Sequence, residues 1–239
     1  GYKIEAYEPL LNTFLELVIK QLSHPFLFEP YHQRILKPFN YYQFGIELMR
    51  PLVIFEKSKV LGLQYADEIE QALKRNENVK LAFQPGTFQL GFGNEIAELY
   101  KHTAVVCMNK EEAEQLLDKE GATVQELMDG LNAMGPKIAI VTDGPHGAYM
   151  KYENTYFSMP LYPDIAPPLE RTGAGDAFFS TFIAYLAKGY DAPYAMRRAP
   201  INSMNVVQHV GAQEGLLTEA QIEEYLKKAP EDYVLSIMK

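Results

Sequence analysis

The sequence has little of what marks secreted and membrane proteins. Its 239 residues include one cysteine, Cys107, so no disulfide can form within the chain. A lone cysteine fits a reducing compartment, and we expect the cytoplasm. No apolar run reaches the roughly 18–20 residues of a membrane span, and the first residues lack the apolar core of a signal peptide. The sequence therefore predicts a globular protein without a membrane span.

Positive charge is also scarce. The chain has 22 Lys and Arg against 31 Asp and Glu, which gives a net charge of −9. Residues 1–63 hold seven basic and six acidic residues, so the excess of acid lies in residues 64–239. This balance disfavours nucleic acid and anionic membranes as main partners. It does not exclude a nucleotide that is bound by backbone groups.

Residues 1–63 differ in character from the rest of the chain. They contain 11 of the 29 Phe and Tyr residues and five prolines. Apolar residues at helical spacing predict a helix over residues 10–22, and Asn40 is a candidate N-cap for a second helix that ends before Pro51. We interpret residues 1–63 as a small helical segment and residues 64–239 as a separate domain.

From residue 64 onward, short apolar runs alternate with helical patterns. This alternation predicts an α/β fold, with a mostly parallel sheet that is covered by helices on both faces. The predicted strands are residues 79–83, 104–108 and 138–141, followed by a hairpin around residues 153–154. The predicted helices cover residues 66–75, 95–100, 110–118, 123–134, a helix that follows Gly175, a helix from about 192 that breaks near Pro200, and 218–228.

Three polar segments stand where such a fold binds ligands. Two of them, residues 109–112 and 142–147, follow the second and third apolar runs, and the third, residues 172–176, precedes a long apolar helix. Ligands of open parallel sheets lie at the carboxyl ends of the strands. We therefore expect the three segments to open on one crevice.

The segment Gly173-Ala174-Gly175-Asp176 has two interpretations. In the functional one, the free N–H groups from Gly173 to Asp176 and the helix dipole bind an anion, such as a phosphoryl group in transfer. Asp176 then takes the proton of an attacking hydroxyl group. In the structural one, the glycines form a tight turn and Asp176 caps the helix.

The other two segments have ordinary structural interpretations as well. Asn109 and Glu112 have the spacing of a helix cap whose third-position acid reaches back, whereas the functional hypothesis gives Glu112 a magnesium-bound water. Thr142-Asp143-Gly144 is typical of a turn that ends a strand. We expect His146 to be a surface residue. No histidine stands at metal-ligand spacing from Cys107, so we assign no structural metal.

Taken in order, five segments resemble the C-terminal part of ribokinase-like (PfkB family) carbohydrate kinases: "KLAFQPGTFQL", "NKEEAEQLL", "IVTDGPHGAYM", "RTGAGDAFFSTFIAYL" and "NVVQHVGAQEGLL". The resemblance covers about residues 66–235. It implies a three-layer ribokinase-like fold and phosphorylation of an alcohol group of a sugar or nucleoside, with ATP and Mg²⁺. The roles that it implies are catalytic base for Asp176, anion hole for Gly173, Ala174 and Gly175, nucleotide binding for Asn109, Thr142, Gly144, Asn202, Asn205 and Val206, and the magnesium region for Glu112.

The chain also departs from that family. The acid-threonine pair that usually precedes the glycine loop is Glu170-Arg171 here, which weakens the case for a monovalent-cation site. Residues 1–63 show neither the early glycine-glycine substrate motif nor the small β lid. Instead, residues 24–63, "HPFLFEPYHQRILKPFNYYQFGIELMRPLVIFEKSKVLGL", are similar to the N-terminal helical region of soluble, plastid- and chlamydial-type glycerol-3-phosphate acyltransferases.

Acyl transfer in that second family depends on a His-x-x-x-x-Asp motif. The residues at this spacing after the five histidines are Glu29, Lys37, Cys107, Lys151 and Glu214, so the motif is absent. We therefore expect a join between two enzyme-like segments near residues 64–80. The leading hypothesis is a kinase, and the alternatives are an inactive nucleotide-binding or structural chimera and, third, an acyltransferase fragment. The sequence names neither the phosphate acceptor nor the oligomeric state.

Overall fold

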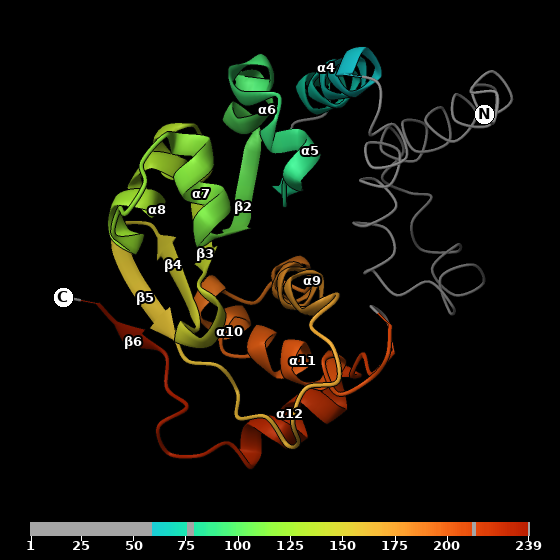
Figure 1. Ribbon diagram of the computed structural model, residues 1–239, viewed down its shortest axis with the longest axis vertical. Helices are drawn as coiled ribbons and strands as arrows, with labels where there is room; N and C mark the ends of the chain where they lie inside the picture. The colour runs from blue at the N-terminus through green and yellow to red at the C-terminus, as the bar shows by residue number, and fades with distance from the viewer. Residues whose placement is uncertain (1–58, 76–78, 212–213, 239) are drawn as a thin grey trace, which may run out of the picture.

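The computed structural model describes residues 59–75, 79–211 and 214–238. The helix predicted over residues 10–22 and the helix predicted between Asn40 and Pro51 lie outside this part. Within it, six strands form one sheet, and they are neighbours in the same order as in the chain (Figure 1). The strands are β1 (Leu81–Phe83), β2 (Thr103–Asn109), β3 (Ile138–Thr142), β4 (Ala148–Tyr152), β5 (Thr155–Met159) and β6 (Ser236–Ile237).

The sheet is mixed. Strands β1, β2 and β3 pair in parallel, and each further pair from β3 to β6 is antiparallel. The three parallel strands coincide with the three predicted apolar runs. The predicted hairpin is β4–β5, and Glu153 turns it with a φ of 54°. The predicted α/β class is confirmed, although its parallel part is confined to the first half of the sheet.

Helices cover both faces of this sheet (Figure 1). Most match the predicted helices, while α5 and the edge strand β6 were not predicted. Helix α4 is longer than predicted and runs across the predicted domain boundary at residues 63 and 64. The helices are α4 (Lys59–Arg75), α5 (Thr87–Leu90), α6 (Ala97–Lys101), α7 (Lys110–Leu117), α8 (Val124–Ala133), α9 (Ala174–Ala187), α10 (Ala192–Met196), α11 (Ala199–Val206) and α12 (Glu219–Lys227), with short 3-10 helices η2 (Gly93–Ile96) and η3 (Gly144–His146).

The alternation of side chains along the strands divides the core in two. In β2, Val105 and Cys107 join a cluster with residues of α9 to α12, whereas Val106 and Met108 join a second cluster with residues of α4 and α6 to α8. Successive side chains of a strand point to opposite faces, so a nearly continuous apolar strand can serve two cores. This is the predicted three-layer arrangement.

Several helix starts follow from local sequence. Helices α7, α8 and α12 each begin with a capping box, in which the N-cap side chain and the third helical residue bond each other's backbone N–H groups. Helix α9 begins differently. Its N-cap is Gly173, which has a left-handed backbone with a φ of 83° and no side chain to close the first turn.

Candidate active site

The carboxyl ends of the parallel strands bring the predicted segments to one edge of the sheet. Asn109 and Thr142 are register partners at the ends of β2 and β3. Gln84 directly follows β1, and its side chain contacts Asp176 in the first turn of α9. Residues from all three predicted segments therefore meet at this edge, together with a residue of a fourth segment.

Asp176 is the third residue of α9, but it does not cap that helix. Its Oδ1 accepts a hydrogen bond from Gln84 Nε2 at 3.3 Å, across 92 residues of sequence. The structural interpretation is thus right about the turn at Gly173 and wrong about the cap, because the N-cap is Gly173 and no side chain accepts a hydrogen bond from the first turn of α9. Asp176 is exposed, yet the protein around its carboxyl group desolvates it and raises its pKa.

The N-terminal turn of α9 leaves most of its amides available. The Ala174 N–H donates to the Arg171 carbonyl oxygen at 3.3 Å, so one of the four N–H groups predicted to be free is already engaged. In the described ranges, Gly173, Gly175 and Asp176 donate their N–H groups to no protein acceptor. Three amide donors at the positive end of a 14-residue helix form a suitable environment for an anion.

The first turn of α9 has neighbours on two sides. Ser203 Oγ of α11 donates to the Ala174 carbonyl oxygen at 2.9 Å. On the other side, a Cβ added at Gly175 would lie 3.5 Å from Gln84 Nε2, and no other atom beyond the neighbouring residues and the helix backbone would lie within 4 Å. The amide of Gln84 therefore lies over the loop, where it can orient the carboxylate of Asp176.

Asn109 and Glu112 form the capping box of α7. Asn109 Oδ1 accepts from the Glu112 N–H at 2.8 Å, and Glu112 Oε2 accepts from the Asn109 N–H at 3.0 Å. The structural interpretation of this pair is confirmed. Partial burial nevertheless raises the pKa of Glu112. Its bond with the Asn109 N–H lowers that pKa, and the negative charges of Glu111 and Asp176 raise it further.

The loop after β3 leaves open space beside its backbone. Thr142 is half-buried at the end of the strand, and Gly144, with a φ of 46°, has no atom within 4 Å of the position that a Cβ would take. Gly147 closes the loop, because its carbonyl oxygen accepts from the Asp143 N–H at 2.9 Å. His146 is exposed on this loop, as predicted.

Asn202, Asn205 and Val206 lie on α11 and are buried. Asn202 donates to Thr181 Oγ1 and accepts from the Leu217 N–H, both at 2.9 Å, so it joins three segments of the fold. Asn205 donates from Nδ2 to the Gly215 carbonyl oxygen at 2.5 Å. These side chains face protein partners, and their place near an adenine stays a prediction.

Gln84 is the site residue that sequence analysis missed. It follows the first apolar run directly, so the rule that singled out Asn109 and Thr142 also applies to it. Pro85 and Gly86 come directly after it and interrupt the strand pattern. The contact of Gln84 with Asp176 joins residues so distant in sequence that only the fold reveals it.

Comparisons with known proteins match the two parts of the chain to different families. A family model described as pfkB family carbohydrate kinase matches residues 52–219. Ribokinase of Bacillus subtilis is 30% identical over 129 residues, which are 54% of this chain and 41% of that protein. The N-terminal segment matches chloroplastic glycerol-3-phosphate acyltransferases, among them that of Spinacia oleracea, which is 37% identical over 71 residues, or 30% of this chain and 15% of that protein.

Solved structures share the fold of the described part. Ribokinase II of E. coli in complex with ATP and Mg²⁺ matches with a TM-score of 0.62 at 22% identity, over 72% of this chain and 56% of that one. Nucleoside kinase of Burkholderia thailandensis in complex with inosine matches with a TM-score of 0.59 at 24% identity, over 73% of this chain and 58% of that one. This chain thus spans about half the length of the kinases that it matches.

Proposed function

The chain belongs to the pfkB family of carbohydrate kinases, and we propose that it transfers the terminal phosphoryl group of ATP to a hydroxyl group of a sugar or a nucleoside. One observation carries the proposal: Asp176 belongs to the first turn of α9, and that turn has three available backbone amides. The matched structures with ATP and Mg²⁺ and with inosine support the choice of donor and of acceptor class.

In the proposed reaction, the acceptor oxygen bonds to the γ-phosphorus while the bond from that phosphorus to the bridging oxygen of ADP breaks. Asp176 takes the proton of the acceptor hydroxyl group. The amides of Gly173, Gly175 and Asp176, with Ala174 holding the turn, face the negative charge on the transferred group. A pKa raised by desolvation makes Asp176 a stronger base than an ordinary aspartate.

The donor set also fits a magnesium ion. Glu112 and Asp176 are carboxylates whose charges repel each other across this edge of the sheet, and desolvation raises the pKa of each. A hard cation with oxygen ligands would offset that repulsion. We propose that Glu112 holds Mg²⁺ through its water, where the ion neutralises charge on the phosphates of ATP.

The nucleotide itself would lie along the ends of β2 and β3. We propose that Asn109 and Thr142 border the phosphates and that the open space beside Gly144 admits part of the nucleotide. Because Asn202, Asn205 and Val206 are buried, we assign them to the wall of the adenine region rather than to direct side-chain contact with the base.

Two observations bear on the compartment. Among the described residues, none of the helices combines the length and apolarity that crossing a bilayer requires. The only cysteine of the chain, Cys107, is buried as a free thiol. We propose the cytoplasm, and we expect small molecules rather than nucleic acid as partners because of the net charge of −9.

The test measures ADP release from MgATP across a panel of sugars and nucleosides that includes ribose and inosine. Asp176→Asn should lower acceptor-dependent turnover about 10²- to 10⁴-fold, the usual worth of a general base. Asp118→Asn is the matched control, because Asp118 is exposed and has a left-handed backbone that asparagine also adopts. Turnover by Asp176→Asn at the parental rate would contradict the assignment of the base.

A melting curve with and without MgATP separates binding from turnover. A ligand that binds only the folded state raises the melting temperature, and we expect this rise in both the parent and Asp176→Asn. A rise without ADP release for any acceptor would favour the inactive nucleotide-binding alternative over a kinase. Acylation of glycerol 3-phosphate by the purified chain would instead support the acyltransferase alternative.

A further inference from the structure

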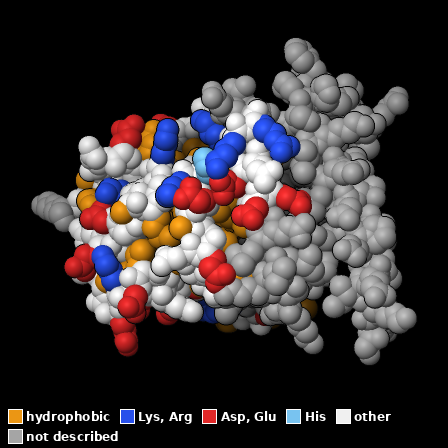
Figure 2. All heavy atoms as spheres, turned by 90° about the horizontal axis from the view of Figure 1, so that it is seen from above, with side chains coloured by type: hydrophobic (Ala, Val, Ile, Leu, Met, Phe, Trp, Pro, Cys, Tyr) orange, Lys and Arg blue, Asp and Glu red, His pale blue; other side chains and the backbone are white. Residues whose placement is uncertain are grey.

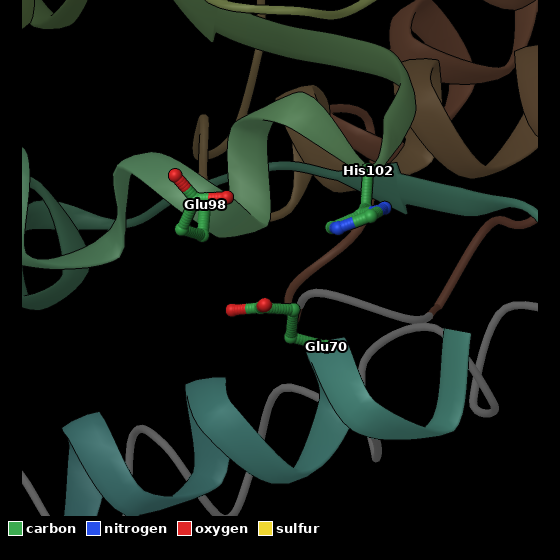
Figure 3. A group of neighbouring side chains, drawn as sticks. All are labelled: Glu70, Glu98 and His102. Atoms are coloured by element: carbon green, nitrogen blue, oxygen red, sulfur yellow. The ribbon is translucent and has the colours of Figure 1, made fainter. Parts of the chain in front are cut away.

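We propose that Glu70, Glu98 and His102 bind a divalent transition-metal ion of the Zn²⁺ class at a second site. The three side chains offer ligand atoms that all lie within 4.8 Å of one another. Figure 3 shows Glu70 of α4 opposite Glu98 and His102, which come from α6 and the residue directly after it. Figure 2 shows acidic, basic and histidine side chains together on the face of the molecule that carries α4 and α6.

This site is remote from the candidate active site. His102 immediately precedes β2, whereas Asn109 ends it. Seven residues of a strand at about 3.3 Å each span roughly 20 Å. The two groups of side chains therefore lie at opposite ends of the same strand, and an ion at one end cannot share ligands with the other.

The spacing of the ligands suits a metal ion. Glu98 and His102 are four residues apart, so they stand on the same face of α6, as the two histidines of a helical zinc motif do. Glu70 supplies a third ligand from a different helix. Three protein ligands with a fourth position for water is the usual arrangement of an open zinc site.

The type of ligand sets the class of ion. An imidazole nitrogen with two carboxylates suits Zn²⁺, Co²⁺ or Ni²⁺, whereas Mg²⁺ and Ca²⁺ take oxygen ligands. In the described part of the chain, the His102 ring makes no hydrogen bond. One of its nitrogens is therefore available to a metal without the loss of a protein contact.

Two lysines now neutralise the glutamates and would have to move. Lys74 pairs with Glu70, and Lys101 pairs with Glu98, each within one helix. Both lysines are more than half exposed, so these ion pairs contribute little to stability and the ammonium groups can return to water.

An ion at this site would link α4 to α6. Helix α4 contains the predicted boundary between the acyltransferase-like and kinase-like segments, and α6 belongs to the core of the kinase-like part. We expect the metal to fix α4 on that core. It would raise the melting temperature without any nucleotide, because the ion binds the folded arrangement and not the unfolded chain.

The experiment titrates ZnCl₂ into EDTA-stripped protein by calorimetry and records melting curves with and without Zn²⁺. We expect one Zn²⁺ to bind the parent and raise its melting temperature. His102→Gln and, separately, Glu70→Gln should each weaken that binding at least tenfold and remove the rise. Glu120→Gln, which changes an exposed glutamate elsewhere, is the matched control and should bind as the parent does.

A double variant separates the two sites. Glu112→Gln with Asp176→Asn removes the acidic groups of the candidate active site and should leave Zn²⁺ binding intact. Equal Zn²⁺ affinity in the parent, His102→Gln and Glu70→Gln would overturn the proposal, as would loss of binding in the double variant alone. Melting curves of the metal-free variants test whether each one folds. Glu98→Gln takes the place of any variant that does not fold.

Discussion

Helices α7 and α9 begin at the same edge of the sheet, and each has an acidic residue at its third position, yet their first turns are built differently. In α7, Asn109 and Glu112 exchange hydrogen bonds, so both side chains satisfy the backbone of their own helix. In α9, the cap is Gly173, and Asp176 pairs with the distant Gln84. The same spacing of an acid therefore has two outcomes, which depend on whether the cap residue has a side chain.

This difference explains why one turn is a better candidate for chemistry than the other. A capping box uses the amide donors that a ligand would need. A glycine cap has no side chain to engage those donors, and it permits the left-handed backbone that Gly173 adopts. The acid of α9 is then free to act on another group.

The largest effect should come from filling the open turn of α9. Gly175→Val places a branched side chain over the available amides, next to Gln84. We expect MgATP affinity to fall at least tenfold, measured by calorimetry, while the protein alone unfolds at nearly the same temperature. Ala187→Val, at the other end of α9, is the control: it adds valine at an exposed helical position away from the amides and should leave ATP affinity at the parental value.

A smaller effect should follow from breaking the closed turn of α7. Asn109→Ala removes an N-cap side chain, which typically lowers the free energy of unfolding by about 1 kcal/mol. Urea denaturation measures it. Glu112→Gln is the matched control, because glutamine completes the same capping box without the charge. Equal losses in the two variants would contradict the view that hydrogen bonding, rather than charge, stabilises this turn.

The smallest effect concerns the pH dependence of stability. The pKa of Asp176 is raised in the fold, so the charged carboxylate destabilises the folded state at neutral pH. This cost disappears as the pH falls through the raised pKa toward that of an unfolded aspartate, about 3.9. Asp176→Asn should therefore be slightly more stable than the parent at pH 7, and the two should converge near pH 4. If the stability difference between Asp176→Asn and the parent grew as the pH fell, the pKa of Asp176 would be lowered rather than raised in the fold.

Much of this fold was visible in the local sequence. The apolar runs predicted β1 to β3, and the helices predicted over residues 123–134 and 218–228 match α8 and α12 to within a residue at each end. These predictions succeeded because a strand inside a covered sheet and the first turn of a helix depend on nearby residues.

What the sequence could not reveal depends on distant partners. Strand β6 has two residues and exists only because it pairs with β5, nearly 80 positions earlier. The contact of Gln84 with Asp176 and the grouping of Glu70 with Glu98 and His102 likewise need the fold. Sequence analysis singled out Asp176 as a site residue, but its structural alternative, a helix cap, was wrong. The position of an acid near a helix start does not show which group its side chain contacts.

Strand β2 also limits which mutations this chain can tolerate. Its alternate residues enter opposite cores, and its last residue begins the capped turn of α7. Replacing one apolar residue by another of similar volume leaves this alternation between the two cores unchanged. A single inserted or deleted residue would exchange the two cores and turn Asn109 to the wrong face. This strand should therefore tolerate substitution far better than any change of length.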